Sequence, residues 1–98
     1  MSDSVESLIA FCRENGRICP LPRVWNQLWE MLPNRSQAGV GWEPPAPLIL
    51  AAWHETPAMP KMLRLADHIE WASRHGALES VACFLRALQE KDWFHVGE

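Results

Sequence analysis

Side chains that could bind a partner recur along one side of a predicted helix in the second half of the chain. His68, Trp71 and His75 are spaced i, i+3 and i+7, so they form one ridge over two helical turns. Arg64 and Arg74 share that side of the helix. A large aromatic ring flanked by arginine and histidine is typical of a protein-binding hot spot. We therefore predict a partner-binding surface formed by Arg64, His68, Trp71, Arg74 and His75.

A proline-rich segment bears on this surface in one of two ways. Pro44, Pro45 and Pro47 favour an extended polyproline conformation, which makes residues 42–47 a stiff internal strap. If the strap lies beside the ridge, Trp42 and Glu43 join the partner-binding surface. If it crosses the ridge instead, it covers Trp71, because prolines pack well against tryptophan rings. The sequence leaves both alternatives open.

The histidines are poorly spaced for a metal site. A helical zinc motif places two histidines at i and i+4, with a supporting carboxylate. His68 and His75 are seven residues apart, which is about 10 Å along a helix at 1.5 Å per residue. Gly39-Val40-Gly41 lacks the lysine and the preceding strand of a phosphate-binding loop. We predict neither a metal nor a cofactor.

Catalysis is a weaker alternative. His54 and Glu55 are adjacent and could act as the acid and base of a small hydrolase-type enzyme. Such an enzyme would need a concave pocket that holds both groups and one of the thiols. The chain has no Gly-x-Ser-x-Gly motif. We therefore favour a non-catalytic protein.

A DNA-binding helix-turn-helix is the other alternative. The turn at residues 75–77 is short enough for one, and residues 78–90 would form the recognition helix. The net charge is −3, however, and the nine lysines and arginines are scattered singly rather than gathered in a stripe. The exposed side of the last helix is nearly neutral, which does not suit a DNA groove. Nucleic-acid binding is therefore disfavoured.

Composition places the chain among ordinary small globular domains. It has 98 residues, 48% of them hydrophobic, which suits one domain with its own core. Its three cysteines form no CxxC pair, its N-terminus carries acids where a secretory signal carries bases, and no stretch reaches the ~20 apolar residues of a membrane span. We expect a cytoplasmic protein with reduced thiols and no membrane association. Six tryptophans and no tyrosine are unusual, and most of the tryptophans should build the core.

Hydrophobic periodicity predicts five helices, at about residues 4–15, 22–32, 47–55, 57–75 and 78–90. Gly76 ends the fourth, so the last two form a C-terminal helical hairpin. The run from Leu48 to Trp53 is apolar on every side, which indicates a helix buried in the middle of the fold. The predicted fold is a single small all-α domain, orthogonal or bundle-like. Its predicted function is binding to another protein or to a second copy of itself.

Overall fold

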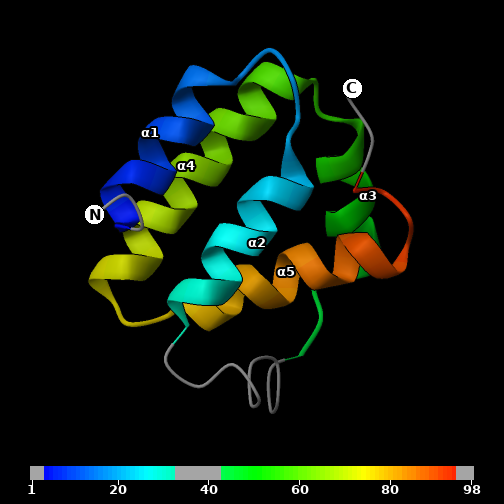
Figure 1. The fold of residues 1–98 in the computed structure, drawn as a ribbon. Helices are drawn as coiled ribbons and strands as arrows, with labels where there is room; N and C mark the ends of the chain where they lie inside the picture. The colour runs from blue at the N-terminus through cyan, green and yellow to red at the C-terminus, as the bar shows by residue number, and fades with distance from the viewer. Residues whose placement is uncertain (1–3, 33–42, 95–98) are drawn as a thin grey trace.

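The computed structural model describes residues 4–32 and 43–94, and within them the chain is entirely helical (Figure 1). No strand occurs among these residues. The predicted all-α fold is confirmed, and each helix begins and ends within one residue of its predicted bounds. The helices are α1 (Val5–Glu14), α2 (Leu21–Met31), α3 (Pro47–Glu55), α4 (Ala58–Arg74) and α5 (Leu78–Glu90).

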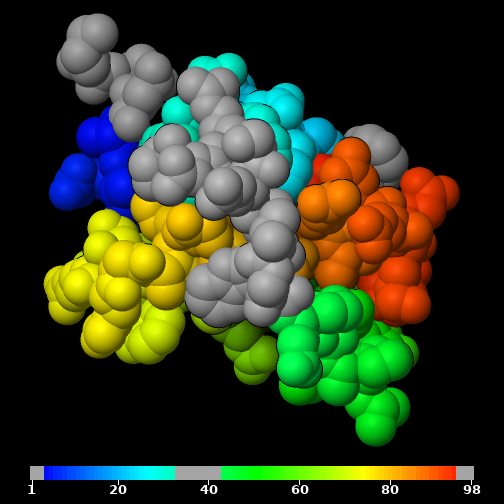
Figure 2. Space-filling view, turned by 90° about the horizontal axis from the view of Figure 1, so that it is seen from below, coloured from blue at the N-terminus to red at the C-terminus, as the bar shows by residue number. Residues whose placement is uncertain are grey.

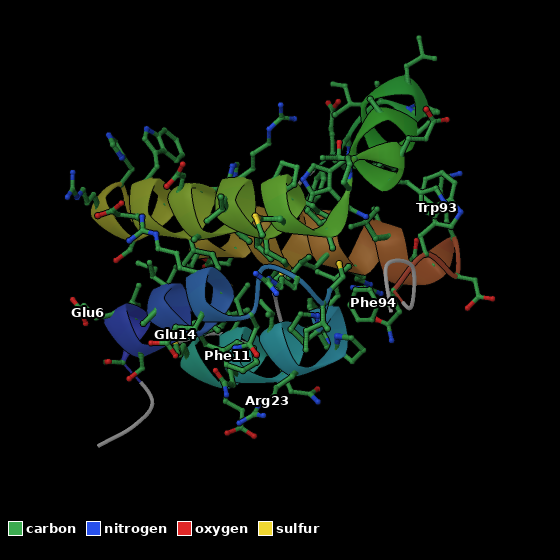
Figure 3. All side chains as sticks on the ribbon, turned by 90° about the horizontal axis from the view of Figure 1, so that it is seen from above. Glu6, Phe11, Glu14, Arg23, Trp93 and Phe94 are labelled. Carbon is green, nitrogen blue, oxygen red and sulfur yellow. The ribbon has the colours of Figure 1, made fainter. Side chains whose placement is uncertain are left out.

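Four of the helices form the body of the domain. Seen from above, α1 and α2 lie on one side and α4 and α5 on the other, with α1 against α4 and α2 against α5 (Figure 3). The radius of gyration is 12.5 Å, close to the roughly 13 Å expected of a single domain of this length. Each of these helices turns an apolar stripe inward. The fully buried centre includes Leu8, Cys12, Leu28, Met62, Ile69 and Leu85.

The C-terminal hairpin turns at a glycine, as predicted. Gly76 has φ +63°, a left-handed conformation that residues with a Cβ adopt at a cost. The N–H of Ala77 donates to the carbonyl of Ala72 at 2.8 Å and closes the turn. α5 then runs back along α4 and packs against it.

The prediction of a helix buried on all sides is wrong for α3. Leu48 is 84% exposed and Ile49 is 58% exposed, and Leu50 is the one buried residue of this helix. α3 lies outside the body formed by the other four helices and projects beside α5, as Figure 2 shows (α3 green, α5 orange). Uniform apolarity here marks a helix at the edge of the molecule rather than at its centre.

The proline strap lies along α5. Pro44, Pro45 and Ala46 have no regular secondary structure and line a shallow depression together with Ala87 and Lys91. Trp71 is 53% exposed. The alternative in which the strap covers Trp71 is therefore wrong.

Candidate functional site

One side of α4 carries an exposed aromatic cluster. The His75 ring stacks on Trp71 with 4.4 Å between ring centroids and 21° between planes, and the His68 ring lies 6.2 Å from Trp71. The Nδ1 atom of His75 is 2.8 Å from the carbonyl oxygen of Trp71, one turn back, which holds the ring in place. With Arg64, these three side chains form what we call the α4 ridge. The structure thus places these four predicted residues on one exposed side of α4.

The other predicted site residues have different places. Arg74 donates to Glu70 at 3.3 Å, and Glu70 also accepts a 3.5 Å hydrogen bond from Arg13 of α1. Arg74 therefore belongs to an ionic network between α4 and α1, with its charge already paired. Glu43 is exposed at the start of the strap. Trp42 lies outside the described residues.

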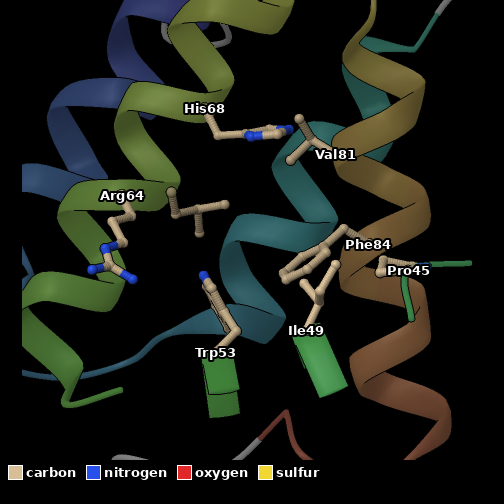
Figure 4. A pocket seen from close by; sticks show the side chains of 8 residues that line it. Pro45, Ile49, Trp53, Arg64, His68, Val81 and Phe84 are labelled. Carbon is tan, nitrogen blue, oxygen red and sulfur yellow. The ribbon is translucent and has the colours of Figure 1, made fainter. Parts of the chain in front are cut away.

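A pocket of about 360 Å³ opens beside the α4 ridge, where α3, α4 and α5 meet (Figure 4). Ile49 and Trp53 line it from α3, and Arg64 and His68 line it from α4. Phe84 of α5 meets the Trp53 ring edge-on at 5.1 Å, which fixes one wall. The volume is in the range of ligand-binding clefts. The lining consists of Pro45, Ile49, Trp53, Arg64, Leu65, His68, Val81 and Phe84.

The charge at this pocket has one sign. The chain as a whole carries a net charge of −3, yet among residues 4–32 and 43–94 no aspartate or glutamate lines the pocket. Arg64 is exposed at the pocket wall, and in the described part of the chain its guanidinium has no hydrogen bond or ion pair. Arg13, Arg74 and Arg86, in contrast, are each paired with a carboxylate. The pocket is an apolar depression whose rim carries a cation with no ion pair among the described residues.

Exposed apolar side chains lie both in the pocket wall, at Ile49, and outside the pocket, at Leu48 and Trp71. Leu48 and Ile49 face solvent on α3, and Trp71 does so on α4. The sequence pattern left open whether Trp71 is exposed, and it placed Leu48 and Ile49 in the core. A uniformly apolar helix has no polar face, so its periodicity does not indicate which residues are covered.

A buried lysine anchors α3. Lys61 of α4 is 1% exposed, and its ammonium donates to the carbonyl of His54 at 3.2 Å, in the last turn of α3. The same ammonium lies 5.0 Å from the centroid of the Trp53 ring. The His54 ring stacks on Trp93 at 4.1 Å, which pins the segment after α5 against α3 (Figure 3). The sequence analysis gave Lys61 no role.

The groups of the catalytic alternative do not gather at this pocket, since His54, Glu55 and the cysteines are absent from its lining. The Nδ1 atom of His54 is buried and has no hydrogen-bond partner within the residues that the structure describes. Glu55 is exposed on α3. Among the described residues, no three His, Cys, Asp or Glu side chains are grouped closely enough to hold a metal ion.

A second exposed apolar patch lies on the far side of α4. Ile18, Met59 and Leu63 are exposed around a depression of about 340 Å³ next to Arg17 and Gly16. The sequence analysis did not single out these residues. The patch has no exposed aromatic ring among its lining residues, which makes it the weaker candidate for a hot spot.

Comparison with family models, with curated proteins and with solved structures gives no match. The site is therefore interpreted from its own chemistry. Within residues 4–32 and 43–94, no helix has the length and apolarity needed to cross a membrane.

The thiols should differ sharply in reactivity. Burial raises the pKa of Cys12 to about 12 from an ordinary 9.0, an effect that neighbouring Arg13 partly opposes. The pKa of this thiol is higher in the folded protein than in the unfolded chain. The stability that the thiol contributes is therefore complete below about pH 9, and it is lost as the pH rises toward 12, because the unfolded chain releases the proton first. At pH 8 we expect iodoacetamide to modify the half-buried Cys83 and to leave Cys12 intact, as read by mass spectrometry of the folded protein.

The variant Cys83→Ser provides the control for this experiment. It should remove the fast-reacting thiol and leave the folded protein almost unmodified. Equal labelling of Cys12 and Cys83 would contradict the assignment.

Proposed function

We propose that this protein is a small protein-interaction domain whose binding surface combines the α4 ridge, the adjoining pocket and the exposed apolar side chains of α3. The observation that carries the proposal is the exposure of Leu48, Ile49 and Trp71 around one apolar pocket. Single exposed apolar residues are ordinary on a protein surface, but large ones grouped at a concavity are typical of interaction sites. Tryptophan and arginine are also enriched at the centres of interfaces.

The DNA-binding alternative has less support. Arg86, on the exposed side of α5, already pairs with Glu90 at 3.5 Å. A recognition helix needs free donors for bases and free cations for phosphates. The unpaired Arg64 lies on α4 at an apolar pocket instead.

Trp71→Ala tests the proposal. Because Trp71 is exposed and its stacking partner His75 is exposed too, we expect the free energy of unfolding to change by only about 0.5 kcal/mol. Association should be lost. The readout is photo-cross-linking in the host cells, with a photoreactive amino acid in place of Leu48. Adducts should form with the wild-type chain and disappear when Trp71→Ala is added.

The control position for the photoreactive amino acid is Asn26, an exposed residue on α2 that lies outside the proposed surface. A cross-linker there should capture far less, and Trp71→Ala should not change what it captures. An adduct of about twice the 11.2 kDa chain mass would identify a second copy as the partner. Equal capture at both positions, or adducts at position 48 that persist with Trp71→Ala, would refute the proposed surface.

A further inference from the structure

The proposed surface has a shape and a charge that narrow down its partner. Arg64, His68 and Trp71 follow one side of α4 and His75 caps its C-terminal end, so the ridge spans about 16 Å at 1.5 Å per residue. α3 flanks the pocket at the other side, with Ile49 and Trp53 directed into it (Figure 4). The result is an apolar pocket between two helices, which we call the groove, and the α4 ridge continues from it past His68 to Trp71 and His75.

The extent of the exposed apolar surface favours a protein over a small molecule. A ligand filling about 360 Å³ would cover Ile49 and Trp53 but not the outlying Trp71, which does not line the pocket. Leu48, the most exposed of the large apolar side chains, is also absent from the lining. A helix that lies in the groove and extends along the α4 ridge could cover Ile49, Trp53 and Trp71 together, as amphipathic helices do in other hydrophobic grooves.

An extended peptide is the less suitable occupant. Such peptides commonly bind by adding a strand to a sheet edge, where backbone hydrogen bonds supply much of the affinity. Residues 4–32 and 43–94 hold no strand and therefore offer no such edge. A helical ligand satisfies its own backbone and needs only side-chain contacts.

The unpaired arginine selects the sign of the partner's charge. Arg64 is exposed at the rim, and no acidic residue of the described part of the chain lines the pocket beside it. A carboxylate on the partner would gain a charge-assisted, bidentate hydrogen bond with Arg64. A partner lysine or arginine would be repelled there.

We propose that the groove binds an amphipathic helix of a partner protein, whose apolar side chains enter the pocket and whose aspartate or glutamate pairs with Arg64. The inference rests on the proposed function and specifies the partner's chemistry. It predicts apolar anchors at i, i+4 and i+7 on the ligand helix with an acidic residue flanking them.

A displayed library of helical peptides of about 16 residues, roughly 24 Å long, tests this. Apolar residues are varied at i, i+4, i+7 and i+11, and the other positions are varied among Ala, Gln, Glu and Lys. The full chain serves as bait. We expect peptides enriched in Glu next to the apolar stripe. Their affinity should fall at least tenfold with Arg64→Glu, and also with Trp71→Ala.

Arg17→Glu is the matched control, because it makes the same charge change. Arg17 is exposed and, like Arg64, has no ion pair in the described part of the chain, but it lies at the second apolar patch. Binding should change less than twofold in this variant. Leu63→Ala, at that same patch, should also leave binding unchanged. Equal losses of peptide affinity with Arg64→Glu and Arg17→Glu would mean that affinity depends on net charge alone, and would overturn the inference.

The remaining outcomes distinguish failure of the acidic-helix partner from failure of the proposed protein-interaction function. Peptides that need Trp71 but show no preference for Glu would overturn the acidic helix and leave the interaction surface in place. If no selected peptide loses affinity with Trp71→Ala, the docking of a helix is overturned. The proposed protein-interaction function is tested separately by the cross-linking experiment. A concentration-dependent dimer in sedimentation that is lost with Leu48→Glu would identify a second copy as the occupant. Octanoate binding that depends on Arg64, without peptide binding, would identify a small apolar acid.

Discussion

Ile69→Ala is expected to lower the free energy of unfolding by about 3 kcal/mol, within the range for truncating a fully buried isoleucine. Ile69 lies on the inner side of α4, where that helix meets the rest of the core. For a domain of this size, such a loss lowers Tm by roughly 12–24 °C. Urea unfolding followed by circular dichroism measures it.

Leu63→Ala is the control on the same helix, since Leu63 is exposed. It should cost less than about 1 kcal/mol, because much of the removed surface is already in contact with water. Similar losses of unfolding free energy in the two variants would mean that the side of α4 that carries Ile69 does not face the core. The position of Trp71 on the exposed side would then be in doubt as well.

The orientation of α4 could be predicted from the sequence because this helix is amphipathic. Apolar residues recur at helical spacing through Met62, Leu65 and Ile69, so the opposite side had to face solvent. Trp71 stood out as a large apolar residue on that polar side. The spacing therefore predicted the ridge but not whether the proline strap covers it, and the structure adds the exposure of Trp71 and the stacking of His75 on its ring.

The orientation of α3 could not be predicted in the same way. Its residues are nearly all apolar, so no polar side marks the direction of solvent. Its environment depends on what the four other helices leave uncovered, which is a property of their packing. The pocket likewise exists only where three helices meet. Hydrophobic periodicity predicted the three helices that line the pocket, but not the pocket between them.

Lys61 shows the same limit for a charged residue. Lysine is almost never fully buried unless its charge is compensated. Here the compensation comes from the carbonyl of His54 in the last turn of α3 and from the face of Trp53. A positive charge at a helix C-terminus is favourable because the free carbonyls there carry partial negative charge. These partners become neighbours only when α3 docks on α4, so the spacing of residues along the chain does not reveal them.

Lys61→Met is expected to lower the free energy of unfolding by about 1–3 kcal/mol, the cost of leaving a buried carbonyl without its charged donor. Methionine keeps the length of the side chain, so the loss reports on the ammonium group rather than on packing. Lys91→Met is the matched control: Lys91 also lies over a tryptophan ring, 5.6 Å from the centroid of Trp93, but it is exposed. Its removal should cost less than about 1 kcal/mol.

The effect of Lys61→Met should also be local, because this lysine joins α3 to α4 and α3 has a single buried residue of its own. Backbone amides of α3 should therefore exchange hydrogen faster in the variant, while those of α1 and α5 change only as much as global stability does. Peptides that bind the groove should bind more weakly, since Ile49 and Trp53 form one of its walls. If the stability of Lys61→Met is unchanged or higher, the cost of desolvating the ammonium is at least as large as the stabilisation from its hydrogen bond. α3 would then be held by Leu50 and by the contact of Trp53 with Phe84.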